Sequence, residues 1–372
     1  MDTLTHALAG AVISDGWFRR RLGPFATPFA LAAAALPDID ILILRLLSPD
    51  NPWLDHRGYT HSLFITLPAA PLLGLAAARL AGKPGEWRAW ALLALLCLYS
   101  HILLDVVTSW GTMLFLPFSN QRAALDAAPI LDIFVFSLSL ASFAANRLLR
   151  REKTETFINP LAYPAVHRHP GRVKLAGRLA RPAGGLILCY LLIGWLQSRQ
   201  TAEIARLELA AAGITAVETR AMPLMFTHLA WSVAARDAEG NVHNAAYSSF
   251  APRPLRFVVQ PAGNGPEAAA ALASPAGKRF AWFTQGMFTA KTAEVLPGDA
   301  SPPGTHSRVE IRDCRFFSLA PPWRPLAGID VFLDSGHRIL SVRERRASLA
   351  EMDLWDELAR LRRLTIGGES GE

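Results

Sequence analysis

Histidine and carboxylate side chains gather in a few short segments of an otherwise apolar N-terminal half. The segment HRGYTHS, residues 56–62, stands directly ahead of a long apolar run. His101 and Asp105 are four residues apart in YSHILLDVVTSWGT, so in a helix they lie one turn apart on one face. A charged side chain in the middle of a bilayer costs roughly 2.5–3.5 kcal/mol, so such groups need a partner or a polar cavity. This pair can ligate a cation or form a His–Asp hydrogen bond between helices.

Two further carboxylates, Asp38 and Asp40, lie in LPDID. They are two residues apart and cannot share one face of a regular helix, and Pro37 indicates a helix start or a kink here. We expect at most one of them to bind a metal directly, while the other positions a neighbour. Helix capping by Asp38 is the alternative, and it leaves Asp40 without a role.

The segment HRGYTHS contains a candidate metal ligand and candidate substrate-binding residues. His61 begins the apolar run, where a helix could hold it rigidly as a ligand. His56 and Arg57 are expected in the preceding loop, where they would serve a substrate, with Arg57 binding an anionic group. His56 also stays a candidate metal contact. Thr60 is expected to be the N-cap of the helix.

Two other polar residues are less distinctive by themselves. His6 alone indicates a packed or interfacial histidine. Asp132 follows Pro129 by three residues and is expected in the first turn of a helix, where the helix dipole favours an acid.

Taken together, these imidazoles and carboxylates form a ligand set of nitrogen and oxygen atoms. Such a set suits Zn²⁺, Mn²⁺ or Fe²⁺, and bridging carboxylates permit more than one ion. The three cysteines, Cys97, Cys189 and Cys314, are scattered and show neither a metal spacing nor a disulfide framework. We find no nucleophile elbow, phosphate-binding glycine loop or Ser/Lys pair in the sequence, which leaves metal-activated water as the natural nucleophile.

The elements that must position these residues are membrane helices. The chain has 372 residues, of which 51% are hydrophobic, and a mean hydropathy of +0.22. Several segments approach the roughly 20 apolar residues that a span requires. They are 25–47, 62–80, 89–107 and 127–149, with 184–196 as a shorter fifth. Residues 4–12 predict a short helix packed on the others, so we expect a bundle of about five or six helices.

The charges between these segments predict an orientation in the inner (plasma) membrane. Lys and Arg concentrate at 19–21, at 83–88 and over 147–181, which the positive-inside rule places in the cytoplasm. HRGYTHS and everything after residue 196 then lie on the non-cytoplasmic side. The start of the chain does not have the pattern of a secretory signal. The net charge is +7, but the arginines are clustered without interleaved aromatic residues, so no nucleic-acid partner is expected.

The sequence changes character near Arg199. Residues 228–250 and 328–346 alternate, turn at Gly240 and Gly336, and alternate again, which is typical of hairpins. Residues 261–277 and 297–305 have the composition of loops, and 349–364 predict an amphipathic helix. We therefore expect a membrane-embedded helical metal-site domain over 1–199 and a soluble extracytoplasmic α+β domain over 200–372.

Four motifs, MDTLTHALAG, LPDID, HRGYTHS and HILLDVVTSWGTMLFLPFS, occur in an order that resembles the YdjM-type membrane-bound metal-dependent hydrolases. The likeness covers about residues 1–135, and AMPLMFTHLAWSV, residues 221–233, resembles a segment in the tail of longer members. That family is distantly similar to the zinc-dependent phospholipase C and single-strand nuclease group of helical phosphodiesterases with a three-zinc cluster. The resemblance implies a set of metal ligands: His6, Asp38, His61, His101 and Asp105.

The chain departs from that group at two positions. It begins Met1-Asp2 rather than with the ligating tryptophan, and the last His-x-x-x-Glu/Asp pair has no counterpart unless Asp126 or Asp132 replaces it. One or two ions, with zinc as the first choice, are therefore expected in place of three.

The function expected from the resemblance is metal-dependent hydrolysis of a phosphoester or lipid-like substrate. Asp38 would position or deprotonate the attacking water, and the substrate would reach the site from the membrane lipid. A non-enzymatic membrane regulator or assembly protein with a structural metal is the alternative, and a closed ligand sphere would favour it. A transporter ranks third, because the ionisable residues map near helix ends. The sequence leaves the oligomeric state open.

Overall fold

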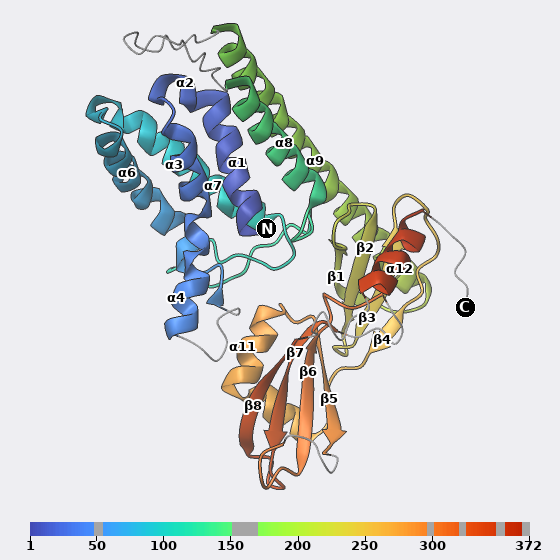
Figure 1. Ribbon diagram of the computed structural model, residues 1–372. Coiled ribbons are helices and arrows are strands. Elements are labelled where there is room, and N and C mark those ends of the chain that lie inside the picture. Colours follow the sequence, from blue (N-terminus) through green and yellow to red (C-terminus); the bar gives the residue numbers. More distant parts are fainter. Residues whose placement is uncertain (48–54, 151–169, 296–300, 320–324, 347–353, 367–372) are drawn as a thin grey trace, which may run out of the picture. The chain divides into compact units, whose positions relative to one another are not determined.

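A computed structural model describes residues 1–47, 55–150, 170–295, 301–319, 325–346 and 354–366. The described chain forms two compact units, one from most of 1–193 and the other from 126–129 and most of 194–372. The first is helical and the second is built on two antiparallel sheets (Figure 1).

The N-terminal unit is a bundle of apolar helices. In it α1 packs against α3, α7 and α8, and α6 packs along α7 (Figure 1). The helices are α1 (Thr3–Ile13), α2 (Arg19–Leu22), α3 (Ala26–Ala35), α4 (Asp40–Leu47), α6 (Leu63–Leu80), α7 (Trp87–Val106), α8 (Ile133–Arg150) and the part of α9 (Pro170–Ala211) up to Ile193.

Three of these helices are long and apolar enough to cross a membrane: Leu63–Leu80, Pro84–Val106 and Arg178–Ala211. The helix over Ile133–Leu149 is apolar but shorter. Three of the expected spans are thus confirmed among the described residues. Of the third basic segment, 147–181, residues 151–169 lie outside the described residues. Helix α1 confirms the short packed helix expected over 4–12.

One expected span, 25–47, is not a single helix. Helix α3 ends at Ala35, a 3₁₀ turn occupies Leu36–Ile39, and α4 begins at Asp40. The break coincides with Pro37, whose ring cannot continue a regular helix. This interruption places Asp38 in the 3₁₀ turn and Asp40 at the first position of α4.

Small residues bring the site-bearing helices close together. A Cβ on Gly10 of α1 would lie 2.4 Å from the Ala30 carbonyl oxygen of α3. A Cβ on Gly74 of α6 would likewise lie 2.3 Å from the backbone of Ala91 in α7. Backbones in contact at glycine and alanine are the usual packing solution between membrane helices. The core around them includes Trp90 and Leu93, both fully buried.

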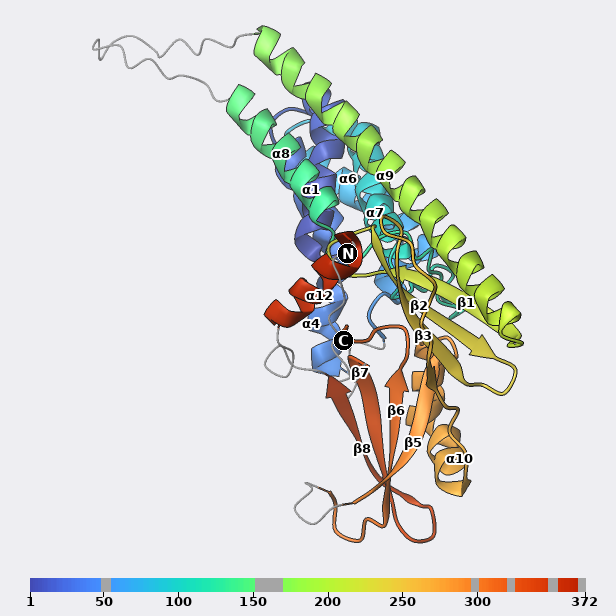
Figure 2. The ribbon, with the colours of Figure 1, turned by 90° about the vertical axis from the view of Figure 1, so that its right-hand side faces the viewer.

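The C-terminal unit contains two four-stranded antiparallel sheets, ordered β1-β2-β3-β4 and β5-β6-β7-β8. Helix α12 (Leu354–Ile366) contacts β2 and β3, and α10 (Pro266–Ala273) contacts β5 and β6, beside β5 in Figure 2. The strands are β1 (Ala216–Pro223), β2 (Ala230–Asp237), β3 (Val242–Ser248), β4 (Val258–Gln260), β5 (Phe288–Glu294), β6 (Ser307–Asp313), β7 (Ala327–Leu333) and β8 (Ile339–Arg346).

Local sequence patterns predicted much of this unit. Strands β2 and β3 pair as the first expected hairpin, and β7 and β8 as the second. Helix α12 confirms the expected closing helix. The expected loop over 261–277 is wrong, because it contains α10 and the start of α11 (Pro275–Phe283). Proline at the first position and Ser274 as N-cap start α11, and both are ordinary helix-start signals. Of the other expected loop, 297–305, residues 301–305 are described, and they belong to no helix or strand.

Candidate metal centre

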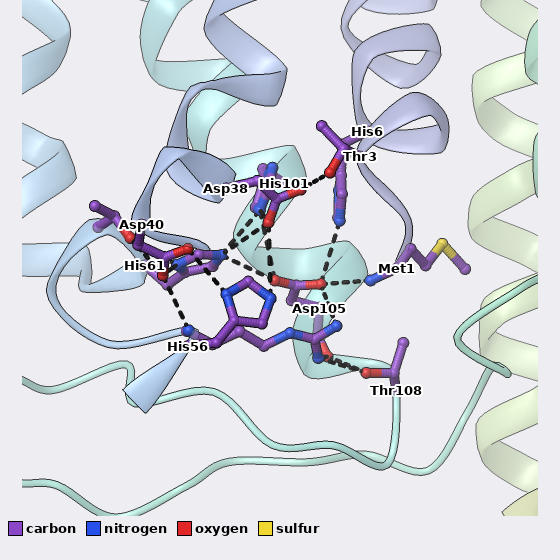
Figure 3. Close-up of polar contacts among 12 residues, drawn as sticks. Met1, Thr3, His6, Asp38, Asp40, His56, His61, His101, Asp105 and Thr108 are labelled. Atoms are coloured by element: carbon purple, nitrogen blue, oxygen red, sulfur yellow. Dashed lines mark hydrogen bonds and ion pairs between the residues drawn. The ribbon is translucent and has the colours of Figure 1, made fainter. Parts of the chain in front are cut away.

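Four buried side chains from three parts of the helical unit converge on one point. Asp38 comes from the 3₁₀ turn after α3, His61 from the 3₁₀ turn Tyr59–His61, and His101 and Asp105 from one face of α7. Each offers one ligand atom, and these atoms all lie within 4.8 Å of one another (Figure 3). The four could hold a metal ion.

The two imidazole rings are fixed with their Nε2 atoms facing each other, 3.0 Å apart. On the far side of His101, Nδ1 lies 2.6 Å from the Ala34 carbonyl oxygen, which can only accept a hydrogen bond. Nδ1 of His101 is therefore the protonated nitrogen, and its Nε2 presents a lone pair. On His61, Nδ1 lies 2.9 Å from the Thr60 hydroxyl and 3.4 Å from Asp40. A histidine whose outer nitrogen donates to an oxygen is the usual arrangement of a metal ligand.

Each of the two carboxylates directs one oxygen at this point and has its other oxygen held elsewhere. Oδ1 of Asp38 lies 3.4 Å from His101 Nε2 and 3.7 Å from His61 Nε2. Its Oδ2 accepts a 2.5 Å hydrogen bond from Thr3.

Asp105 repeats the arrangement. Its Oδ2 lies 3.1 Å from His61 Nε2 and 3.5 Å from His101 Nε2. Its Oδ1 is bound by Arg57 at 2.9 Å and by the amino group of Met1. The second oxygen is therefore left for the centre.

Asp40 lies on the opposite side of His61. Its Oδ2 accepts hydrogen bonds from the Arg57 backbone N–H and the Thr60 hydroxyl, each at 3.1 Å. Its Oδ1 lies 2.9 Å from His56 Nδ1. Asp40, His56 and His61 form a second group with metal-ligand spacing, but in it Asp40 approaches the Nδ1 of His61 and not the Nε2. Asp40 thus orients His61 toward the four-residue centre.

The charges at the site favour a cation. Burial opposes ionisation of Asp38, but hydrogen bonds with His101 and His61 outweigh it and hold its pKa below the usual range. The pKa of Asp40 is lowered in the same way, because hydrogen bonds with His56 and His61 outweigh burial. Burial would lower the pKa of His61, yet hydrogen bonds to Asp105, Asp38 and Asp40 raise it to about 10. The carboxylates therefore attract a positive charge here, which a proton or a metal ion can supply.

Of the other residues expected to bind metal, one lies beside the centre and one lies away from it. The His6 ring stacks on His101 at 3.7 Å between centroids, and its Nε2 lies 3.2 Å from Asp105 Oδ1. Asp132 belongs to neither metal-like group. Its carboxylate accepts from the backbone N–H of Val135 and from Tyr190, so it caps α8.

Asp126, considered above as a stand-in ligand, forms a bidentate ion pair with Arg220. That ion pair accounts for the buried Asp126 carboxylate without a metal ion.

Arg57 and His56, the two residues expected to bind a substrate, have more contacts within the protein than the sequence indicated. The Arg57 guanidinium is buried and donates to the Asp105 carbonyl and to Thr108 Oγ1, at 3.2 and 2.8 Å. His56 is the more open, with 16% of its side chain exposed against 0% for His61.

Thr60 is not the cap of α6. Ser62 is, accepting from the Phe64 N–H, while Thr60 points to Asp40 and His61.

Two supporting residues, Thr3 and Thr108, were missed by sequence reasoning. Thr3 lies three residues before His6 in the first helix, and Thr108 lies three residues after Asp105, just beyond the end of α7. That spacing is the signal that would have found them.

The residues present fit a divalent metal ion by their chemistry. The donors are two imidazole nitrogens and two carboxylate oxygens, a set common to zinc and other first-row metals. The Nδ1 of His6 is buried without a hydrogen-bond partner among the described residues. Such an orphaned polar atom carries a penalty that a bound cation would remove.

Comparison with known proteins identifies a family for the helical half of the chain. The sequence profile of the YdjM inner membrane protein family matches residues 1–201, which include every residue of the centre. The chain is also similar to the inner membrane protein YbcI of Escherichia coli (strain K12), with 32% identity over 121 residues, covering 32% of this chain and 69% of YbcI. No solved structure matches. The match over more than half of the chain, together with the membrane helices, shows that this protein is an inner membrane protein of the YdjM family.

Proposed function

We propose that this protein is a metal-dependent hydrolase that acts on a phosphoester or lipid-like substrate. The observation that carries the proposal is the convergence of Asp38, His61, His101 and Asp105 on one buried point, with both imidazole Nε2 atoms facing inward. A bound divalent cation, zinc being the first choice, would act as a Lewis acid that activates water and polarises a phosphoryl oxygen.

The chain's own residues suit the remaining tasks. Hydrogen bonds hold the pKa of the Asp38 carboxyl below its usual range, and its Oδ1 faces the two imidazoles, so this oxygen could orient the attacking water or accept its proton instead of binding the metal. Thr3 fixes the other oxygen of Asp38 and keeps the carboxylate in one orientation. Arg57 places a buried guanidinium beside Asp105, and its Nε has no hydrogen-bond partner among the described residues. That cation is suited to a developing negative charge on a phosphoryl group.

A lipid-like substrate fits the surroundings of the partly exposed His56. Asp40, which contacts His56, is the first residue of α4. Along this helix Leu42, Ile43 and Leu46 are exposed, the last by 84%. An apolar helix surface next to a polar, histidine-lined centre can accept an acyl chain while the headgroup meets Arg57.

A second function, a structural metal in a membrane regulator or assembly protein, is supported by the number of ligands. Four protein atoms are enough to fill the tetrahedral sphere typical of structural zinc, whereas catalytic sites keep a position for water or substrate. The two functions therefore differ in whether one of the four side chains leaves a coordination position open.

Metal analysis and cobalt substitution of the detergent-purified full chain distinguish these functions. Elemental analysis should find one or two equivalents of metal, lost in His101→Ala. In the Co²⁺-substituted protein, inorganic phosphate should change the visible absorption if a position is open. Hydrolysis of a chromogenic phosphodiester and of phospholipid vesicles should then depend on the metal. A tightly bound metal with an unchanged cobalt spectrum and no hydrolysis would favour the structural function, and a metal-free protein would end both.

A further inference from the structure

An exposed group of apolar side chains lies at one end of the first sheet. Met225 and Leu229, in the connection between β1 and β2, are 43% and 40% exposed, and Phe250, after β3, is 66% exposed. The Ser249 N–H donates to the Leu229 carbonyl, which keeps Phe250 beside that connection. We name Met225, Leu229 and Phe250 the apolar tip. Large apolar side chains gathered on a surface mark an interaction site.

The chain that carries the tip suits an apolar environment. Residues 221–230, AMPLMFTHLA, contain no Asp, Glu, Lys or Arg. Three of its backbone N–H groups are paired within the segment: Leu224 N–H donates to the Ala230 carbonyl, Thr227 N–H to the Leu224 carbonyl, and Leu229 N–H to the Thr227 hydroxyl. A loop placed against lipid needs such pairing, because no water is present to satisfy its polar groups.

The same connection is fastened to α9. A Cβ on Gly194 would lie 2.4 Å from the His228 ring, so His228 rests directly on this glycine. One turn later, the Ser198 hydroxyl donates to the Ala221 carbonyl at 2.8 Å. These contacts fix the level of the tip along α9, at residues 194–198.

That level coincides with the end of the uncharged stretch of α9, a candidate membrane span. Between Arg181 and Arg199, α9 carries no charged residue, a length of about 27 Å at 1.5 Å per residue, close to the roughly 30 Å hydrocarbon core of a bilayer. Gly194 lies about 20 Å beyond Arg181 on the same scale. Trp195, with the Arg199 guanidinium 5.7 Å above its ring, has the composition of a lipid–water boundary.

We propose that the apolar tip inserts into the headgroup region of the bilayer that α9 crosses, and so anchors the C-terminal unit to the membrane surface. The partner is lipid rather than another protein, because the tip is fastened to α9 where its uncharged stretch ends. The proposal is independent of the hydrolase proposal, since it rests on no residue of the metal centre.

The test uses the full chain in vesicles of phosphatidylethanolamine and phosphatidylglycerol. In a Cys189→Ser background, Leu229→Cys or Met225→Cys is labelled with an environment-sensitive fluorophore before reconstitution. Cys97 and Cys314 are buried and stay in place. Glu239→Cys, in the turn at the opposite end of the β2–β3 hairpin, is the matched control. Quenching is measured with shallow spin-labelled lipid and with iodide on both sides of the bilayer.

We expect both tip probes to show blue-shifted emission, strong quenching by the labelled lipid and protection from iodide. The probe at Glu239→Cys should show no blue shift, little quenching by the labelled lipid and strong quenching by iodide. Iodide quenching of the tip equal to that of Glu239 would overturn the proposal, because the tip would then face water. Protection from iodide without quenching by lipid would also overturn it, since a second copy or another protein would then cover the tip. Agreement between the two tip positions excludes a local effect of either substitution.

Discussion

The substitution Asp40→Asn tests whether Asp40 orients a ligand or is one. Asp40 approaches His61 on its Nδ1 side, 3.4 Å away, whereas Asp38 approaches the Nε2 side at 3.7 Å. The asparagine keeps the size of the side chain but loses the charge and places an NH₂ among donors from Arg57 and Thr60. His61 should then be less firmly oriented while the four-residue centre stays complete.

Asp40→Asn should lower the affinity for the metal ion without changing the number of ions bound. Removing an outer partner of a metal-bound histidine costs about 10- to 100-fold in metal affinity, or about 1.4–2.8 kcal/mol. Asp38→Asn removes a ligand oxygen from the centre itself and should abolish stable binding. Asp132→Asn should change neither quantity, because that carboxylate caps α8.

Elemental analysis of the detergent-purified variants gives the stoichiometry, and competition with a chelating dye gives the affinity. Thermal unfolding of each apo protein controls for loss of fold. If Asp40→Asn removes one whole equivalent of metal and leaves another bound at full affinity, a separate ion is held by Asp40, His56 and His61. If Asp38→Asn keeps its metal, the assignment of Asp38 to the centre is refuted. A loss of metal in Asp132→Asn would restore that residue as a ligand.

Four further predictions address other parts of the molecule. Arg57→Lys keeps the charge beside Asp105 but not the paired donors, so metal should stay bound while turnover falls by about 100-fold; unchanged hydrolysis would remove Arg57 from the reaction. Asp126→Asn removes the carboxylate that pairs with the buried Arg220 and should lower the free energy of unfolding by about 3–5 kcal/mol. Glu203→Gln, in the exposed pair with Arg206, should leave the free energy of unfolding almost unchanged. Equal shifts of the two variants in chemical denaturation would contradict this. Burial lowers the pKa of His228 to about 4, so the unfolded chain binds the extra proton and stability should fall by up to about 3 kcal/mol from pH 6.5 to 4; His228→Phe should flatten that dependence in thermal melts. A membrane-impermeant maleimide should label Glu239→Cys from the non-cytoplasmic side and Lys83→Cys only after the cells are opened, and the reverse pattern would invert the proposed topology.

The sequence by itself determined those features that depend on near neighbours along the chain. The four-residue spacing of His101 and Asp105 places both on one face of α7, because helix geometry fixes that relation without tertiary contacts. The hairpins β2–β3 and β7–β8 followed from alternation and turn residues for the same reason. Membrane helices could be recognised because span length and apolar composition are local properties.

Only the tertiary structure decided what depends on contacts between distant segments. Asp38 and Asp40 have nearly the same local sequence, and which one faces Nε2 of His61 depends on how the turn after α3 meets the turn before α6. Thr60 has the sequence of a helix cap but donates to Asp40, twenty residues earlier.

Asp132 is the same kind of acid as the residues of the centre. It is used at the start of α8 because the Val135 N–H and the Tyr190 hydroxyl reach it there. A carboxylate binds whichever donors the fold brings to it. Its role is therefore a property of the packed structure, and the residue type fixes only what chemistry is available.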